Sequence, residues 1–283
     1  MPLVTTGLWG HCLNRESPGA TAPEIRATPH TVGPYGPSDW AWEFLRRNQD
    51  YATDWRASVP RQLPYVTLCD GTQVLRLRRR YPRAERWGLY AFTNPSKTAS
   101  ETPVFWLPST SRRLVRARYV KPDHRDEAAT SPLAAFQVSR SAAIGVDGIP
   151  VVMLKGQGSH VAVELHDATP LTRPSRIVFE LDGLDDLNGQ TERLKTLQRF
   201  MKPPPRSDGG SSFANDERLY HALVALDASM AGKTYRQIAI AIFGEKRVAE
   251  EWGGASQFLK DRTRRLVAKG HELMGGGYRD LLT

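Results

Sequence analysis

Hydrophobic and polar positions change their period along the chain, and this change predicts the fold class. Between about residues 75 and 181, apolar residues alternate with polar ones or form short continuous runs, which is typical of β-strands. After residue 184 they recur every three or four positions, which is typical of amphipathic helices. We therefore expect an α+β protein with a small N-terminal α+β domain, a central strand region and a helical C-terminal domain.

The N-terminal region begins with residues 1–38, which are rich in Gly, Pro, Thr and Ser and are predicted to form a disordered arm. Asp39 to Tyr51 then predicts a helix that is capped by Ser38 or Asp39, with Glu43 placed where a carboxylate helps the cap. This helix carries two tryptophans, a phenylalanine and a tyrosine. Such an aromatic surface belongs either to a core or to an interface between protomers.

The first domain is predicted to span residues 39–125 and to combine strands with a concentration of positive charge. Strands are expected at LRLRRRY, RWGLYAF, PVFWLP and RRLVRARYV. Residues 61–125 contain 14 basic and 4 acidic residues, so this stretch is a second candidate surface for phosphate. Its aromatic residues could stack on bases, but side chains at strand spacing more often form a core; they are Trp87, Tyr90, Phe92, Phe105 and Trp106.

A linker at residues 126–135 is predicted to lead into a central block at residues 136–201. The runs IPVVML, HVAVEL and RIVFEL predict three strands, and Leu184 to Phe200 predicts an amphipathic helix. The Gly156-Gln157-Gly158 sequence fits a hairpin turn but completes no nucleotide-binding loop. A second linker at residues 202–215, rich in Pro, Gly and Ser, separates this block from the C-terminal domain at residues 216–283.

The C-terminal domain is predicted to be a helix-turn-helix-like unit. Its first helix closes at Gly232, and a second helix begins at the N-cap Thr234 and ends at Gly244. Ala239 supplies the small side chain that a close helix crossing requires. The segment from Glu245 to Gly254 is too long for a tight turn, so it is expected to hold an additional helical turn.

The last predicted helix separates an apolar stripe from a basic face. Leu259, Thr263 and Val267 lie on the buried stripe together with Leu266. Between residues 256 and 269 the chain has five basic residues and one acid. Because phosphates and guanine edges are acceptors that Arg and Lys satisfy, these basic residues are candidate DNA contacts; they are Lys260, Arg262, Arg264, Arg265 and Lys269.

A basic helix face is often only a solvated surface, so the charge of the whole chain matters here. The formal net charge is +9 and the isoelectric point is near 9.7. A basic chain is the electrostatic pattern expected of a nucleic-acid-binding protein. The charge therefore disfavours simple solvation, although charge alone does not name the partner.

Several of these motifs together resemble a known family. The sequences WAWEFLRRNQDY, WGLYAF and VFWLP resemble the N-terminal domain of a group of proteobacterial transcriptional regulators. ALVALDASMAGKTYRQIAIAIFG, Trp252, RTRRLVAKG and GGGYRDLL resemble the DNA-binding domain of FseA-type and RovC-type activators. The resemblance implies sequence-specific promoter binding and transcriptional activation. FseA-like members control excision and transfer of integrative conjugative elements, so it also implies control of a mobile element.

The resemblance adds Tyr278 and Arg279, which match the closing motif of the family, to the candidate DNA-binding residues. Physically, Gly275 to Gly277 let the chain turn sharply and lay Tyr278, Leu281 and Leu282 onto the helical unit. Arg279 would then stand near the helix termini, within reach of a phosphate. A structural clasp without DNA contact explains the motif equally well.

The sequence does not favour an enzyme, a metal site, a cofactor or a membrane protein. Cys12 and Cys69 form no zinc-binding pattern, and the His residues have no HExxH spacing. Tyr278 would need a His-x-x-Arg partner motif to resemble a tyrosine recombinase, and the chain has none. The longest apolar run is far too short for a membrane helix, and a cytoplasmic location is expected.

The sequence also allows partners other than promoter DNA. The helix-turn-helix scaffold could instead be a protein-interaction module whose basic face binds an acidic regulator, with RNA polymerase and a small antiactivator protein as candidate partners. A homo-oligomer is expected because one recognition helix reads too few base pairs for genomic selectivity. The aromatic helix at Trp40 to Tyr51 is the candidate interface.

Overall fold

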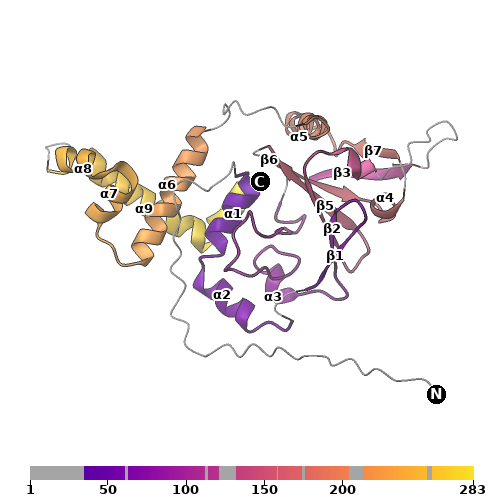
Figure 1. Ribbon diagram of the computed structural model, residues 1–283, viewed down its shortest axis with the longest axis horizontal. Coiled ribbons are helices and arrows are strands. Elements are labelled where there is room, and N and C mark those ends of the chain that lie inside the picture. Colours follow the sequence, from indigo (N-terminus) through magenta and orange to yellow (C-terminus); the bar gives the residue numbers. More distant parts are fainter. Residues whose placement is uncertain are drawn as a thin grey trace, which may run out of the picture.

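The computed structural model describes residues 35–60, 63–111, 114–120, 132–157, 159–173, 176–203, 213–253 and 257–283. A β-sheet occupies one end of the molecule and helices α6 to α9 the other, with α1, α2 and α3 between them (Figure 1). The predicted arm lies almost entirely outside the described residues. The α+β fold class is confirmed.

One sheet contains strands from both predicted N-terminal blocks. Its strand order is β1-β2-β4-β5-β6-β3-β7, with β2 parallel to β4 and β3 parallel to β6. The division at residues 126–135 is therefore wrong, because strands on either side of it pair directly. The strands are β1 Tyr65–Thr67, β2 Gln73–Arg76, β3 Leu114–Val120, β4 Ser139–Ile144, β5 Pro150–Gly156, β6 Ser159–Leu165 and β7 Arg176–Glu180.

The central strands are apolar without interruption because both faces of the sheet are covered. On β5, Val152 and Leu154 join the core that Leu197 and Phe200 of α5 (Leu187–Phe200) complete. The alternate residues of β5 pack on the opposite face, together with Phe105. A sheet buried on both faces favours continuous apolar runs over alternation. The strands predicted from the three central runs are confirmed, and so is the helix that follows them.

The predicted helix at Asp39 to Tyr51 is two helices, α1 (Pro37–Leu45) and α2 (Gln49–Arg56). Asn48 interrupts it, because its side-chain oxygen accepts hydrogen bonds from the backbone N–H groups of Asp50 and Tyr51 and caps α2. The N-cap of α1 is Gly36, and the carboxylate of Asp39 accepts a hydrogen bond from its N–H at 3.0 Å. Glu43 takes no part in the cap.

The aromatic segments RWGLYAF and PVFWLP form no strands. They contribute one isolated bridge between Leu89 and Trp106, after the short helix α3 (Pro82–Glu85). Gly88 has a φ of +81° and turns the chain away from an extended course. The aromatic side chains form a core instead, in which Tyr51 packs edge-on against Trp87. The interpretation of these aromatics as core is confirmed, and their assignment to strands is wrong.

The C-terminal region consists of α6 (Phe213–Met230), α7 (Tyr235–Phe243), α8 (Glu245–Glu251), α9 (Phe258–Gly275) and the 3-10 helix η2 (Gly277–Leu282). Thr234 caps α7 and forms a reciprocal capping box with Gln237. The additional helix in the long connection is present as α8. No helix within the described ranges is long and apolar enough to cross a membrane.

The C-terminal helices share their largest core with α1. Leu223 and Leu226 of α6, Leu273 of α9, and Leu282 of η2 pack in one cluster with the aromatic residues of α1. Two smaller clusters belong to the helical unit alone. The C-terminal unit therefore shares its largest core cluster with the rest of the chain, whereas an independent domain was expected.

Candidate nucleic-acid interface

The buried face of α9 fixes the orientation of the helix. Leu259, Thr263, Val267, Gly270 and Leu273 are buried, and their spacing of three or four residues places them on one stripe. The hydroxyl of Thr263 donates a hydrogen bond to the Leu259 carbonyl oxygen at 2.8 Å, so it needs no partner outside the helix. The charged residues between these positions lie outside the buried stripe, whereas Leu266 packs against the core.

Small residues let α9 pack closely against its neighbours. A Cβ atom at Gly270 would lie 2.6 Å from the Ala222 carbonyl oxygen of α6, so only glycine fits at this crossing. On the other side of the unit, Ala239 of α7 is completely buried against Val248 and Leu259. α6, α7 and α8 thus hold α9 as part of a packed scaffold.

The exposed basic face lies on the N-terminal half of α9. Arg264 and Arg265 are exposed, and Lys260 is half-buried one turn before Arg264. The Arg264 guanidinium lies 3.3 Å from the Asp261 carboxylate, and Arg265 Nε donates to the Asp261 carbonyl oxygen at 3.3 Å. Exposed pairs of this kind contribute about 0–1 kcal/mol, so both side chains can exchange them for phosphate or base contacts at little cost.

Arg262 and Lys269 lie on the other flank of α9 from Lys260 and Arg264. The Arg262 guanidinium stands 4.9 Å from the centre of the Phe243 ring of α7, and Lys269 Nζ lies 2.9 Å from the Glu272 carboxylate. Burial of the neighbouring His221 imidazole lowers its pKa, and the cation of Arg262 lowers it further. The five candidates therefore do not form one narrow face: Lys260 and Arg264 lie one turn apart on one flank of α9, and Arg265 and Lys269 lie one turn apart on the other flank, near Arg262.

Tyr278 is completely buried, and this removes it from any surface that could meet DNA. Its hydroxyl donates to the Trp87 carbonyl oxygen at 2.9 Å, and its ring lies 5.7 Å from that of Trp106. Arg279 is half-buried, and its Nη2 donates to the Arg86 carbonyl oxygen at 2.7 Å. The closing motif therefore holds the helical unit against the N-terminal half. For Tyr278 this is the alternative of a structural clasp without DNA contact.

Sequence reasoning missed the cations at the N-terminus of α7. Lys233 and Arg236 are exposed on either side of the Thr234 cap. The first turn of a helix presents unpaired N–H groups and a partial positive charge, both of which favour phosphate. The N-cap at Thr234 would have been enough to find these cations, because it locates the first turn of the helix in the sequence.

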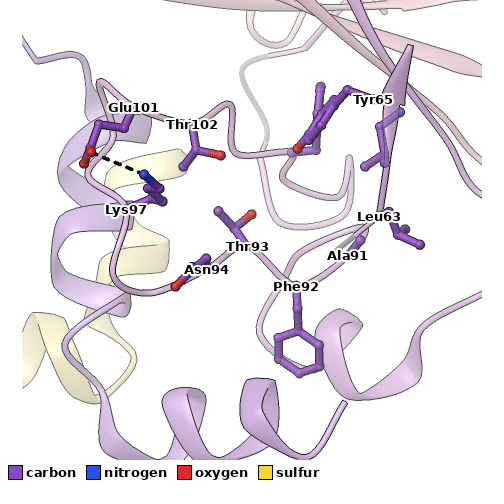
Figure 2. Close-up of a pocket in the computed structure, with 11 residues that line it drawn as sticks. Leu63, Tyr65, Ala91, Phe92, Thr93, Asn94, Lys97, Glu101 and Thr102 are labelled. Carbon is purple, nitrogen blue, oxygen red and sulfur yellow. Dashed lines mark ion pairs between the residues drawn. The ribbon is translucent and has the colours of Figure 1, made fainter. Parts of the chain in front are cut away.

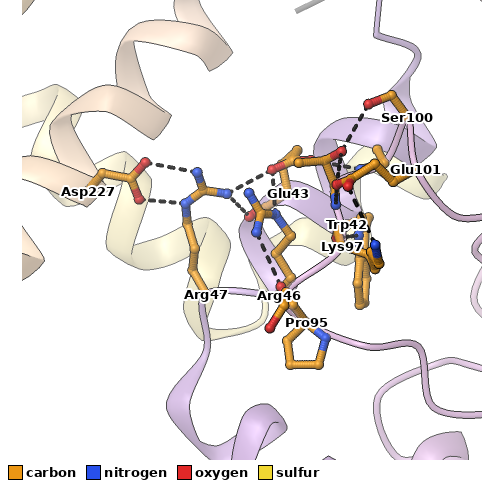
Figure 3. A network of polar contacts seen from close by, with 12 residues as sticks. Trp42, Glu43, Arg46, Arg47, Pro95, Lys97, Ser100, Glu101 and Asp227 are labelled. Atoms are coloured by element: carbon orange, nitrogen blue, oxygen red, sulfur yellow. Dashed lines mark hydrogen bonds and ion pairs between the residues drawn. The ribbon is translucent and has the colours of Figure 1, made fainter. Parts of the chain in front are cut away.

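A buried network of charged groups joins α1 to the helical unit (Figure 3). Arg47 Nε and Nη2 donate to the two carboxylate oxygens of Asp227 on α6, at 2.5 and 2.8 Å. Its Nη1 donates to Glu43, which also accepts from Arg46 at 2.6 Å. Burial alone would raise the pKa of Glu43, but the nearby guanidiniums of Arg46 and Arg47 lower it. The scaffold that carries α9 is thus fixed to α1 by paired charges.

The described part of the chain contains a small cavity and a larger open groove. The cavity in Figure 2 has a volume of about 80 Å³, far below the roughly 300–1,000 Å³ of ligand pockets. The larger open groove of about 640 Å³ lies between α1 and the sheet. Lys155, which faces that groove, lies 2.6 Å from the Asp39 carboxylate. Arg140 donates to the Phe136 carbonyl oxygen at 2.8 Å, so both cations already have partners within the chain.

An exposed basic half-helix on a packed helical scaffold is the arrangement of helical DNA-binding proteins. Residues 183–283 match the family model described as "T6SS, Transcription factor, DNA binding domain", and residues 30–90 match "Proteobacterial transcriptional regulator-like domain". These matches confirm the resemblance and its order of domains, and the protein is a DNA-binding transcriptional regulator. The C-terminal match begins upstream of α5, earlier than the predicted boundary at residue 216. No curated protein matches the chain.

Proposed function

We propose that the protein binds promoter DNA in a sequence-specific manner and activates transcription. The observation that carries this proposal is the exposed face of α9, where Arg264 and Arg265 project, with the half-buried Lys260 one turn before Arg264, from a helix whose opposite face is buried. A side chain on a rigid helix enters a groove in a defined position, and this is what base discrimination requires. Arg264 and Arg265 take the base-reading role, and Lys260 contacts phosphate.

The test is a double Arg264→Ala, Arg265→Ala variant. Each good base or phosphate contact contributes about 1–3 kcal/mol, so promoter affinity should fall about 30-fold or more. The matched control is Arg176→Ala with Arg199→Ala, two exposed arginines of β7 and α5 that carry the same charge. Circular dichroism checks that both variants fold. Unchanged promoter affinity in the folded α9 variant would exclude these residues from the interface.

The second candidate function is a protein-interaction module in which the same face binds an acidic protein. The 11 basic and 9 acidic residues in residues 216–283 support it, because the helical unit as a whole is only weakly basic. Phosphate contacts release counterions, so DNA binding must weaken steeply with salt and compete with bulk duplex DNA. Binding to RNA polymerase or to a small antiactivator protein would survive an excess of competitor DNA.

The target promoters can be found by footprinting. The FseA-type resemblance supports genes for excision and transfer of a mobile element, whereas the description of the family matched by the C-terminal region names T6SS. Footprinting on the promoter upstream of the protein's own gene and on neighbouring promoters distinguishes these two gene sets.

We also propose that the protein binds its operator as a homo-oligomer, since one helix reads few base pairs. The interface must differ from the one expected from the sequence. Trp40, Trp42, Phe44 and Tyr51 are all buried within the chain. Light scattering at micromolar concentration tests this proposal, and a strict monomer that binds its promoter tightly would refute it.

A further inference from the structure

A second cationic surface lies on the segment that leads from β2 through α3. Six arginines occur in eleven residues and all are exposed; they are Arg76, Arg78, Arg79, Arg80, Arg83 and Arg86. We call this set the arginine surface. It belongs to the N-terminal half of the chain, and the function proposed for α9 does not involve it.

The backbone of this segment is held by apolar side chains that point inward. Leu77 is buried, and its N–H donates to the Ile144 carbonyl oxygen at 3.0 Å. Ala84 and Trp87 are also buried, and α3 is closed by hydrogen bonds to the Tyr81 carbonyl oxygen. The arginines are therefore presented from a fixed backbone, which lowers the entropy lost when they bind a partner.

The positive charge of this surface is only partly compensated. Arg80 pairs with Glu85, and Arg86 lies 3.3 Å from the Asp54 carboxylate. Arg76, Arg78 and Arg83 form no ion pair with any residue that the structure describes. Three cations are thus available to an anionic partner without breaking an existing pair.

The C-terminal motif brings a further arginine to the same place. Arg279 Nη2 donates to the Arg86 carbonyl oxygen at 2.7 Å, so η2 lies directly against the end of the arginine surface. Arg264 lies in the N-terminal half of α9, and Arg279 lies in η2, beyond the C-terminal end of that helix. With a rise of about 1.5 Å per residue, Arg264 is roughly 17 Å along the helix axis from the last residue of α9, Gly275, or about five base pairs of duplex.

We propose that the arginine surface binds the phosphate backbone of DNA beyond the base pairs read by α9. The inference rests on the function proposed for α9. Protein interfaces are organised around apolar and aromatic anchors, but Leu77 and Ala84 of this segment are buried and Tyr81 is half-buried. Arginine matches phosphate through bidentate hydrogen bonds, and the charge pattern is that of a surface built for a polyanion. The surface adds affinity and positions the duplex without reading sequence.

The experiment compares Arg78→Gln, Arg83→Gln with the control Arg176→Gln, Arg199→Gln, both in the full chain. Affinity for mixed-sequence duplexes of about 12 and about 30 base pairs is measured against KCl concentration by fluorescence anisotropy. On the longer duplex, the first variant should reduce the slope of log affinity against log salt by up to about 2, since each phosphate contact contributes about 0.9. The control should leave the slope unchanged, and Arg78→Lys, Arg83→Lys should restore most of it.

The outcomes separate this inference from the function on which it rests. If the wild type binds both duplexes and the arginine variant has the slope of its control, the arginine surface does not contact DNA and the inference is overturned alone. If the wild type binds no duplex, both proposals are overturned. Unchanged DNA binding together with weakened binding to poly-glutamate would assign the surface to an acidic protein and would also overturn the inference.

Discussion

The two halves of α9 differ in what surrounds them. The N-terminal half exposes Arg264 and Arg265, whose nearest partners are on the same helix. In the C-terminal half, Gly270 and Leu273 pack against α6 and α1, and Tyr278 follows in the same core. The C-terminal half packs against the rest of the chain, while the N-terminal half buries only one stripe and keeps two arginines accessible. A recognition helix needs both features in order to present its side chains from a fixed position.

The same contrast appears between individual arginines. The Arg47 side chain is 1% exposed and is held by two carboxylates, whereas that of Arg264 is 62% exposed. Burial makes the loss of a partner expensive, while an exposed guanidinium exchanges partners with little change in free energy. Arginine thus stabilises the scaffold at one site and is available for a partner at the other.

The largest effect is expected from Arg47→Met, which leaves the carboxylates of Glu43 and Asp227 without this guanidinium. Breaking a buried pair costs about 3–5 kcal/mol, so the free energy of unfolding should fall by that amount in urea denaturation. The control is Arg118→Met, whose exposed guanidinium lies 3.2 Å from Glu180 and should contribute about 0–1 kcal/mol. Equal losses in the two variants would show that the Arg47 network does not anchor the helical unit.

A smaller loss is expected from Gly270→Ala, which tests the anchored half of α9. The new methyl group would meet the Ala222 carbonyl oxygen and Leu226, forcing α6 and α9 apart. Overpacking of this kind costs about 1–3 kcal/mol. Gly275→Ala is the matched control on the same helix, since no atom lies within 4 Å of its added Cβ. Thermal denaturation should destabilise the first variant and spare the second.

Tyr278→Phe should remove about 1–2 kcal/mol of stability, because the Trp87 carbonyl oxygen loses a buried hydrogen-bond donor. Its affinity for duplex DNA should equal that of the wild type under native conditions. A folded Tyr278→Phe protein with reduced DNA affinity would restore Tyr278 to the interface and contradict the role of a clasp.

The sequence predicted the parts of the structure that depend on local pattern. The strands β5 to β7, the N-cap of α7 and the buried stripe of α9 all follow from spacing and cap residues. Nonlocal pairing was not predictable in this way. β2 lies parallel to β4 although 62 residues separate Arg76 from Ser139. No feature of either strand indicates which strand it pairs with.

The aromatic segments were misassigned for a related reason. Strand propensity of Trp, Tyr and Phe reflects burial against neighbours rather than an intrinsic backbone preference. RWGLYAF and PVFWLP are buried, but in turns that pack on α1. For the candidate site, helical period identified the residues that face outward but could not show that Tyr278 is buried, because its partners Trp87 and Trp106 lie more than 170 residues away in the sequence.

The smallest effect on stability is expected from a change in pH, through protonation of His221 on α6. Its ring lies 6.0 Å from that of Phe243, with Glu217 at 3.9 Å and Arg262 nearby. Burial, and then the charge of Arg262, lower its pKa below the ordinary value of 6.5, although Glu217 opposes this shift. The folded state therefore favours the neutral ring. This contribution is fully present above pH 6.5 and is lost as the pH falls through the lowered value.

Urea denaturation between pH 7.5 and 5 should show a decline in the free energy of unfolding of the wild type that His221→Gln lacks. Glu43 does not interfere, because its pKa lies below the ordinary 4.5 and its contribution is lost only in more acidic solution. Parallel curves for the two proteins would mean that the imidazole is equally solvated in the folded and unfolded chains.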